Sequence, residues 1–229
     1  MAEENANHYC TLQLLSPAGD KTKAALLKES KWEPGTRISV GFLEGDSGLQ
    51  QRVQSVAQEW TGPEMANLSL DFTGGTAADL RVAFEQGNGS WSYLGTQAQQ
   101  IAANEPTINF GWLTPDSSDD ELRRVVLHEF GHALGLIHEH QNPDTPIAWN
   151  RAAVIAALSG PPNNWPVDVI EHNIFEKYDP AELATTPVDK DSIMMYAIPA
   201  SWTTDGFSAD LNRKLSDTDK EFIRVAYPW

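Results

Sequence analysis

The sequence predicts an α+β protein: a twisted, mixed five-stranded sheet with two long helices, followed by an irregular part that ends in a helix. Three features of the chain predict this architecture. Five short segments alternate apolar with polar residues or are rich in β-branched residues. Two longer segments carry apolar residues at helical spacing, and prolines recur at short intervals after residue 138. The order of these segments favours a sheet with its helices packed on one side.

The five strands are expected at residues 36–43, 68–72, 79–84, 91–94 and 107–112. The first of them shows the pattern well, because its apolar residues alternate and several are β-branched. Residues 9–15 could form a further strand, and residues 21–31 could form a short helix. Both lie in the N-terminal stretch before residue 36, which is the least readable part of the chain.

Helical spacing predicts an amphipathic helix that ends near Trp60, with an apolar face formed by Leu49, Val53, Val56, Ala57 and Trp60. A second helix is expected from residue 119, because residues 119–127 contain neither Gly nor Pro. Carboxylates gather at its start, where they complement the positive end of the helix dipole; a calcium site is the alternative interpretation. These residues are Asp116, Asp119, Asp120 and Glu121.

After residue 138 only two segments look helical. Residues 152–158 form one of them. The other opens at Ser216, which has the spacing of a capping box with Asp219, and it runs to Ala226 before Pro228 stops it. The chain is therefore expected to divide near residue 138 into a regular half and an irregular half, with a cleft between them.

Composition limits the partners of this chain. Its 229 residues include 32 acidic and 16 basic ones, for a formal net charge of −16. Such a charge argues against nucleic acid or an anionic membrane as partner. No apolar run is long enough to span a bilayer, and the first residues lack the basic and apolar regions of a signal peptide. We expect a monomer that does not insert into membranes.

The eleven residues from 128 to 138 read H-E-x-x-H-x-x-G-x-x-H. If the second helix continues through them, His128 and His132 lie on one face, about 6 Å apart along the axis, where both can bind one Zn²⁺. Gly135 can end the helix in a left-handed conformation, so that His138 can return to the same ion. The long form of the motif is therefore a strong signal for a zinc site.

Three histidine ligands leave one position of a tetrahedral zinc open, which is typical of a catalytic site and not of a closed structural one. Glu129 follows the first ligand directly and lies near the open position. There it can take a proton from a bound water as a general base. The sequence thus predicts one catalytic Zn²⁺ with a carboxylate beside it.

The zinc motif and residues 192–196, which read Ser-Ile-Met-Met-Tyr, together resemble the metzincin clan of zinc endopeptidases, and within it the astacin family. The astacin Met-turn reads S-x-M-x-Y, with Met194 and Tyr196 at the matching positions. A glutamate after the third histidine, Glu139 here, is also typical of the family. Serralysin-like enzymes and matrixins fit less well, because the former carry calcium-binding Gly-rich repeats and the latter lack the Met-turn tyrosine.

The resemblance implies a metzincin, zincin-like fold and the hydrolysis of peptide bonds in protein or peptide substrates. Glu129 would activate water and pass its proton to the leaving amine. Tyr196 would stabilise the oxyanion, or act instead as a fifth zinc ligand. Met194 would form an apolar floor under the imidazoles. Residues 89–95 are similar to the family's edge strand, so substrate would add as an extended strand along Ser90, Trp91, Ser92 and Tyr93.

Three regions are expected along the chain. Residues 1–35 form a poorly defined N-terminal extension, residues 36–138 form an upper subdomain with the sheet and the active-site helix, and residues 139–229 form a lower subdomain with the Met-turn. The resemblance also implies secretion, although the chain shows no signal peptide and a cytoplasmic location stays open.

Cys10 is the only cysteine, so an internal disulfide is excluded, whereas animal members of the family carry disulfides. This difference indicates a microbial-type relative. Cys10 is expected to be a free thiol in an apolar stretch, and the alternative is a thiolate that caps the zinc in a latent form.

A second functional class competes with the peptidase: a catalytically silent, zinc-stabilised module that binds protein without cutting it. Glu129 and Tyr196 argue against this class, because a purely structural metal needs neither of them.

Overall fold

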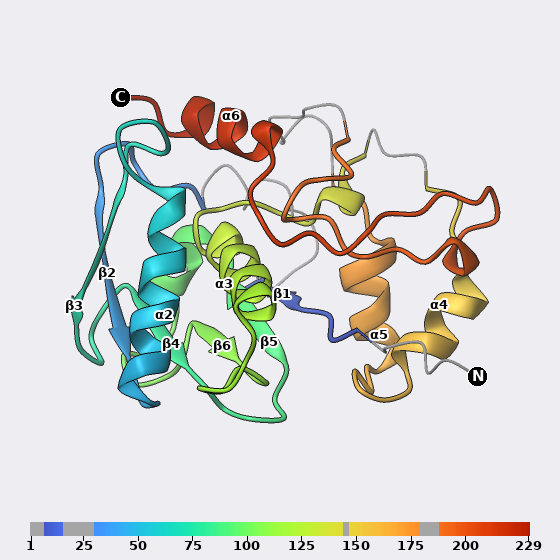
Figure 1. The fold of residues 1–229 in the computed structure, drawn as a ribbon, viewed down its shortest axis with the longest axis horizontal. Coiled ribbons are helices and arrows are strands. Elements are labelled where there is room, and N and C mark those ends of the chain that lie inside the picture. The colour runs from blue at the N-terminus through green and yellow to red at the C-terminus, as the bar shows by residue number, and fades with distance from the viewer. Residues whose placement is uncertain (1–6, 16–29, 144–146, 179–187) are drawn as a thin grey trace.

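A computed structural model describes residues 7–15, 30–143, 147–178 and 188–229. Within them six strands form one sheet in the order β1-β5-β6-β4-β2-β3 (Figure 1). Neighbouring strands run parallel except β5 and β6, which are antiparallel. The strands are β1 Thr11–Gln13, β2 Arg37–Phe42, β3 Ser69–Gly74, β4 Leu80–Ala83, β5 Ser90–Tyr93 and β6 Ile108–Phe110.

The mixed sheet and its five predicted strands are confirmed. The sixth strand, β1, comes from the segment 9–15, whose apolar alternation already indicated a strand. It pairs with the outer edge of β5, with Thr11 opposite Trp91 and Gln13 opposite Tyr93. The helix expected at residues 21–31 falls almost entirely outside the described residues.

Both long helices are also confirmed, and Figure 1 shows them on the same side of the sheet. The first is α2, Ser47–Ala57, continued by the 3₁₀ turn η1, Gln58–Trp60. The second is α3, Asp119–Ala133. The Asp46 carboxylate caps α2 by accepting from the amides of Gly48 and Leu49. Ser118 caps α3, and three carboxylates occupy its first turn, as expected for a stabilised helix dipole.

The main hydrophobic core lies between the sheet and these two helices. It buries apolar side chains from every layer, including Ile38, Val40, Val53, Leu80, Val82, Ile108, Leu127 and Phe130. Three aromatic side chains also fix the C-terminal half of α3 by donating to its carbonyls. Trp60 donates to Leu127 at 2.9 Å, Trp32 to Ala133 at 2.8 Å and Tyr227 to Leu134 at 2.6 Å. The end of α3 is therefore held from three directions.

The half after residue 138 has its own core around Ile147, Val154, Ile170, Ile174 and Trp202. Its elements are η3 Glu139–Gln141, α4 Arg151–Leu158, α5 Val167–Ile170, η4 Glu171–Phe175, η6 Ala200–Trp202 and α6 Asp217–Ala226. The capping box of α6 is confirmed. Sequence patterns missed α5 and η4, because their few apolar residues sit among polar ones. The six-residue 3₁₀ segment η2, Gly95–Gln100, lies in the other half.

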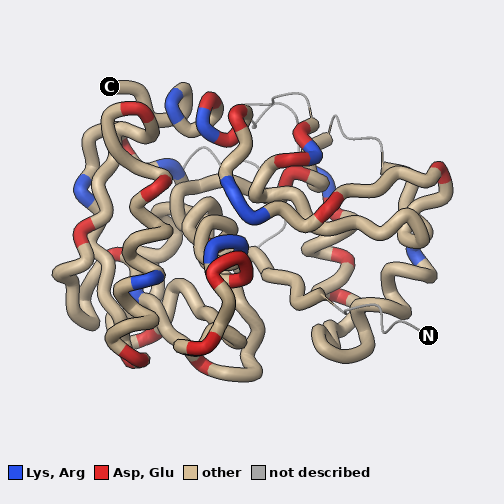
Figure 2. Tube along the Cα trace, in the orientation of Figure 1, with Lys and Arg blue, Asp and Glu red and all other residues tan. Residues whose placement is uncertain are grey.

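The C-terminal helix α6 returns to the first half, where Ile223 and Tyr227 join the main core. The division of the chain at residue 138 stays a prediction. Figure 2 shows acidic and basic residues interspersed over both halves, and some pair between elements, such as Arg52 with Asp119 at 2.8 Å. No helix among the described residues has both the length and the apolar character that crossing a bilayer requires.

Gly131 in α3 packs closely against Met194 and Trp60, and this close packing gives a testable prediction. A Cβ at this position would lie 2.4 Å from Met194 Sδ and 3.3 Å from the Trp60 ring. Because overpacking costs about 1–3 kcal/mol and Ala gains about 1 kcal/mol of helix propensity over Gly, Gly131→Ala should lower the free energy of unfolding by up to about 2 kcal/mol. Chemical denaturation measures the difference.

Gly160→Ala is the matched control, since its nearest new contact would be at 3.8 Å. It should change the free energy of unfolding by less than about 0.5 kcal/mol. A Gly131→Ala protein at least as stable as the parent would contradict close packing of α3 on Met194.

Candidate metal centre and active site

The end of helix α3 brings three histidines together. His128 and His132 lie one above the other on its last turns, and Leu134 is the C-cap. Gly135 then adopts a φ of +94°, and the amides of Gly135 and Leu136 donate to the carbonyls of His132 and Gly131 at 2.8 and 3.0 Å. This double hydrogen bond is a Schellman motif, which only a residue tolerant of positive φ closes cheaply. The chain reverses there, as expected, and returns His138 to the helix.

A nitrogen atom from each of His128, His132 and His138 lies within 4.8 Å of the other two, and all three side chains are buried. Among the described residues they form the group able to hold a metal ion. The fold thus brings the three predicted ligands close enough together to bind one ion.

Each ring has its Nδ1 beside an oxygen that can only accept. His128 lies 2.8 Å from the carbonyl of Ile193, and His132 lies 2.8 Å from the carbonyl of Leu136. His138 lies 3.0 Å from Gln141 Oε1, and the Gln141 Nε2 atom is committed as donor to the His172 carbonyl. Each Nδ1 must therefore carry the proton, which leaves every Nε2 with a free lone pair.

These lone pairs have no protein partner. The Nε2 atoms of His132 and His138 face each other at 3.1 Å, although neither can donate, and the buried Nε2 of His128 makes no hydrogen bond within the described residues. Buried polar atoms without partners are costly and rare. Three converging acceptors of this kind fit a divalent cation such as Zn²⁺, whose histidine ligands usually donate their other nitrogen to a protein oxygen.

Burial also keeps the rings neutral. Desolvation lowers the pKa of His128 to about 4, against the opposing effect of its bond to Ile193. Burial first, and then the neighbouring imidazoles, hold the pKa values of His132 and His138 well below their usual range. Neutral imidazole is the form that binds metal.

Glu129 is fully buried beside His128, and neither of its carboxylate oxygens makes a well-formed hydrogen bond within the described residues. Burial raises the pKa of Glu129 to about 8, while nearby Cys10 and Arg124 act in the opposite direction. An unpaired buried carboxylate is unusual in a core and is typical of a functional group.

The Met-turn, residues 192–196, packs against the end of α3 that carries the histidines. Met194 lies against α3 at Gly131, the carbonyl of Ile193 orients His128, and the carbonyl of Met194 accepts from the amide of Glu139 at 3.0 Å. The Tyr196 ring lies 4.4 Å from that of His138 between centroids. Its hydroxyl donates to the carbonyl of Cys10. The structure thus brings Met194 and Tyr196 to the histidines, as expected.

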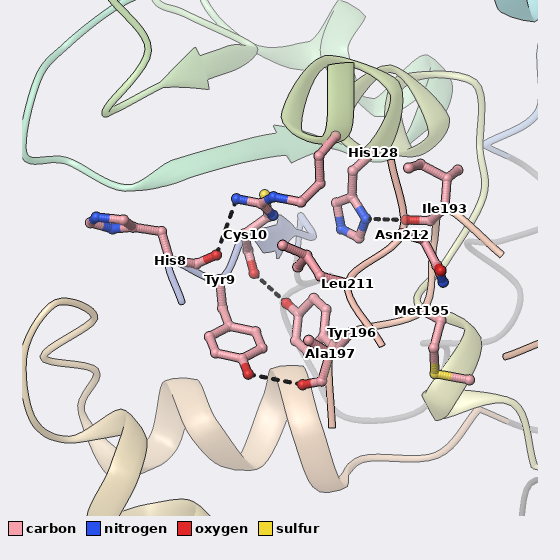
Figure 3. A pocket seen from close by; sticks show the side chains of 11 residues that line it. His8, Tyr9, Cys10, His128, Ile193, Met195, Tyr196, Ala197, Leu211 and Asn212 are labelled. Atoms are coloured by element: carbon pink, nitrogen blue, oxygen red, sulfur yellow. Dashed lines mark hydrogen bonds between the residues drawn. The ribbon is translucent and has the colours of Figure 1, made fainter. Parts of the chain in front are cut away.

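The N-terminal segment 7–15 lies across this site and along β5 (Figures 1 and 3). Strand β5 is formed, as expected, by Ser90, Trp91, Ser92 and Tyr93. The edge of β5 that was expected to be open to a substrate is paired with β1. Cys10 is buried in the same groove, beside Arg124, His128 and Tyr196. Burial raises the pKa of the Cys10 thiol well above its usual range. The thiol is free, as expected. The alternative, that Cys10 caps the zinc as a thiolate, stays a prediction.

Polar side chains that sequence patterns missed hold the backbone of this segment. Asn163 Oδ1 accepts from the amide of Tyr9 at 2.9 Å, and Asn163 Nδ2 donates to the carbonyl of Asn7 at 3.0 Å. Asn173 accepts from the amide of Leu12 at 3.0 Å. The groove therefore binds an extended chain through main-chain groups. No local sequence signal could have found these residues, since their partners lie more than 150 positions away.

Other polar residues lie around the three histidines or in the neighbouring strands. Gln141 orients His138, and His140 contacts the Asn173 carbonyl at 2.8 Å. Asn109, in β6, bonds to Glu85 and Gly89 and to none of the three histidines. Glu139 accepts from the amide of Asp189, and burial raises the pKa of Glu139 to about 7.

Comparisons with known proteins agree with this geometry. Residues 26–221 match the model of the peptidase family described as Astacin. One structure of myroilysin aligns with a TM-score of 0.84 and 44% identity, covering 89% of this chain and 98% of that one. A crystal structure of myroilysin aligns with a TM-score of 0.69 and 40% identity, covering 96% and 91%.

Two curated sea-urchin proteins are more distant relatives. Blastula protease 10 of Paracentrotus lividus is 27% identical over 134 residues, which is 54% of this chain and 19% of the relative. Protein SpAN of Strongylocentrotus purpuratus is 27% identical over 133 residues, or 56% and 20%. The chain thus spans about a fifth of the length of these relatives. The family model covers most of the chain, and three buried histidines converge in a group that could hold a metal ion: the chain belongs to the astacin family of zinc metallopeptidases.

Proposed function

We propose that this chain is a zinc-dependent endopeptidase in which His128, His132 and His138 hold one catalytic Zn²⁺ and Glu129 is the general base. The convergence of three Nε2 lone pairs beside an unpaired buried carboxylate carries this proposal. Bound zinc would supply a Lewis acid that polarises the scissile carbonyl and lowers the pKa of water. A silent, zinc-stabilised binding module would have no need of the carboxylate.

The chain's own residues perform the remaining tasks. The Nδ1 bonds to Ile193, Leu136 and Gln141 hold each imidazole in one orientation and one tautomer. Glu129 would accept a proton from the attacking water and deliver it to the leaving amine. The Tyr196 hydroxyl already donates to a peptide carbonyl, that of Cys10, and would donate to the substrate oxyanion in the same way.

The described conformation supports a closed state of the enzyme. A substrate that adds a strand to β5 needs the edge that β1 occupies, so both cannot bind at once. The N-terminal segment must therefore leave the groove before a protein substrate can enter. Proteins or peptides outside the cell are the proposed substrates, in keeping with the family.

Replacing the base tests the mechanism. Glu129→Gln keeps the shape of the side chain but cannot accept a proton. Once limited proteolysis has removed the N-terminal segment from both proteins, the rate of peptide hydrolysis should therefore be at least about 10²- to 10⁴-fold lower in this variant than in the parent. Zinc content, measured by elemental analysis, should stay at one ion per chain. Hydrolysis of a generic protein substrate at an unchanged rate in this variant would reject Glu129 as the base.

Gln141 gives a separate test of how the ligands are oriented. Gln141→Met removes the acceptor for His138 Nδ1, so zinc affinity, measured by competition with a chelator, should fall about 10- to 100-fold. Gln50→Met, which makes the same change at a surface side chain that bonds, among the described residues, only to the carbonyls of Glu44 and Gly45, is the control and should keep the parental affinity. Equal affinities for parent and Gln141→Met would show that this bond does not matter.

A further inference from the structure

We infer that Asn163 binds the main chain of the substrate and acts as a carboxamide clamp beyond the part of the groove that β5 lines. This inference rests on the proposed peptidase function and adds a binding residue to it. The clamp holds the two peptide groups on either side of one substrate residue, whatever the side chain of that residue is.

Asn163 holds the N-terminal segment at two peptide groups. Its Oδ1 atom accepts from the amide of Tyr9 at 2.9 Å, and its Nδ2 atom donates to the carbonyl of Asn7 at 3.0 Å. One donor and one acceptor are also what a neighbouring strand would offer to the same chain. The Asn163 side chain thus takes the place of a strand where the sheet does not reach, since the pairing of β1 with β5 begins only at Thr11.

The residue between the two clamped groups is held through its main chain as well. This residue is His8, whose side chain is exposed and whose carbonyl accepts from Arg124 Nη2 at 3.4 Å. In an extended chain that carbonyl faces the edge opposite to the two groups that Asn163 binds. Main-chain atoms on both edges are therefore held, and binding of this kind gives affinity that does not depend on sequence.

The Asn163 carboxamide is free to turn over, unlike that of Asn173. Asn173 Oδ1 accepts from the amide of Leu12, but its Nδ2 atom donates to the Val169 carbonyl at 3.1 Å, which fixes the orientation of the group. Within the described residues the Asn163 side chain bonds only to the N-terminal segment, so its donor and acceptor can change places. A chain that runs in the opposite direction presents its N–H and C=O groups in the opposite order. Asn163 can therefore clamp a substrate of either direction, although β1 itself runs parallel to β5.

The clamp lies on the path of a substrate through the groove. Tyr196, the proposed oxyanion donor, bonds to the carbonyl of Cys10, and Figure 3 shows the chain from His8 to Cys10 beside Tyr196. His8, the residue inside the clamp, is two positions from Cys10. A substrate that pairs with β5 on one side of Tyr196 therefore passes Asn163 on the other side. The clamp engages only substrates that continue past this point, as the substrates of an endopeptidase do.

The first experiment tests the clamp in the full chain, without turnover. Asn163→Ala removes both hydrogen bonds, so the Tyr9 amide should exchange with solvent at least about fivefold faster than in the parent, as measured by NMR. Asn164→Gly truncates the exposed neighbouring amide and is the matched control, because Gly tolerates the φ of 51° at this position. Its Tyr9 amide should exchange within about twofold of the parental rate. An unchanged rate in Asn163→Ala would overturn the inference.

The second experiment measures substrate binding in the open groove. The zinc-loaded Glu129→Gln chain, from which limited proteolysis has removed the N-terminal segment, is titrated with an unstructured peptide. It is also titrated with analogues of that peptide in which an ester replaces one peptide group at a time. An ester lacks the N–H donor, so the analogue altered at the clamp should bind about three- to tenfold more weakly, the equivalent of one hydrogen bond.

Adding Asn163→Ala identifies that analogue. This change should weaken binding of the unaltered peptide at least about threefold, and it should abolish the cost of the ester at one position only. Asn164→Gly should leave the cost of every ester as it was. A structural defect would lower the affinity for all peptides alike, so the comparison separates a bond to substrate from a change in fold. The inference is wrong if each ester costs the same with and without the Asn163 side chain, or if no peptide binds.

Turnover separates this inference from the proposed function. With Glu129 in place, Asn163→Ala should raise KM at least about threefold and keep kcat within about twofold, because the clamp binds substrate and transition state alike. Cleavage with an unchanged KM in Asn163→Ala would overturn the clamp and leave the peptidase in place. A zinc-loaded chain that binds peptides through Asn163 but cleaves none of them would overturn the peptidase and leave the clamp.

Discussion

The structure depends on one constraint: three buried imidazoles must all present bare Nε2 atoms to the same point. Each is forced into that tautomer by an oxygen from a different part of the chain, namely the Met-turn carbonyl of Ile193, the post-helix carbonyl of Leu136 and the side chain of Gln141. Because the rings are desolvated, an error in any acceptor would leave a buried donor unpaired. The site is therefore specified by hydrogen bonds as much as by the spacing of the histidines.

The C-terminal helix takes part in this constraint from a distance. Asp219 in α6 accepts from Ser192 Oγ at 2.7 Å and from the Ile193 amide at 2.8 Å, and it also closes the capping box with Ser216. The Asp219 carboxylate thus holds the Met-turn at Ile193, and the carbonyl of Ile193 orients His128. Since Ile223 and the C-cap Tyr227 anchor the same helix in the main core, α6 couples the packing of the first half to the geometry of the three histidines.

The parts of the molecule that sequence predicted are those that local chemistry determines. Helix α3 needs only its capped acidic start and its apolar spacing, and Gly135 needs only a turn that tolerates positive φ. The zinc motif is likewise contained in eleven residues. Even the segment 9–15 carried the alternation of a strand. Its partner did not follow from this pattern, because β1 pairs with residues 80 positions away and its backbone bonds to Asn163 and Asn173 farther still. Long-range contacts of this kind leave no local signal, and so the occupied groove emerged only from the fold.

A closed groove and a prepared metal centre fit together in one account. The N-terminal segment adds a strand to β5, gives a carbonyl to Tyr196 and donates the Tyr9 hydroxyl to Ala197, so it occupies the place that we propose for a substrate. The proposed activity depends on the metal more than on any of these contacts. X-ray absorption at the zinc edge on the purified full chain tests it most directly. We expect one zinc ion per chain with three imidazole nitrogens at about 2.0–2.1 Å. A chain that holds no zinc, or an ion bound by fewer than three histidines, would contradict the account.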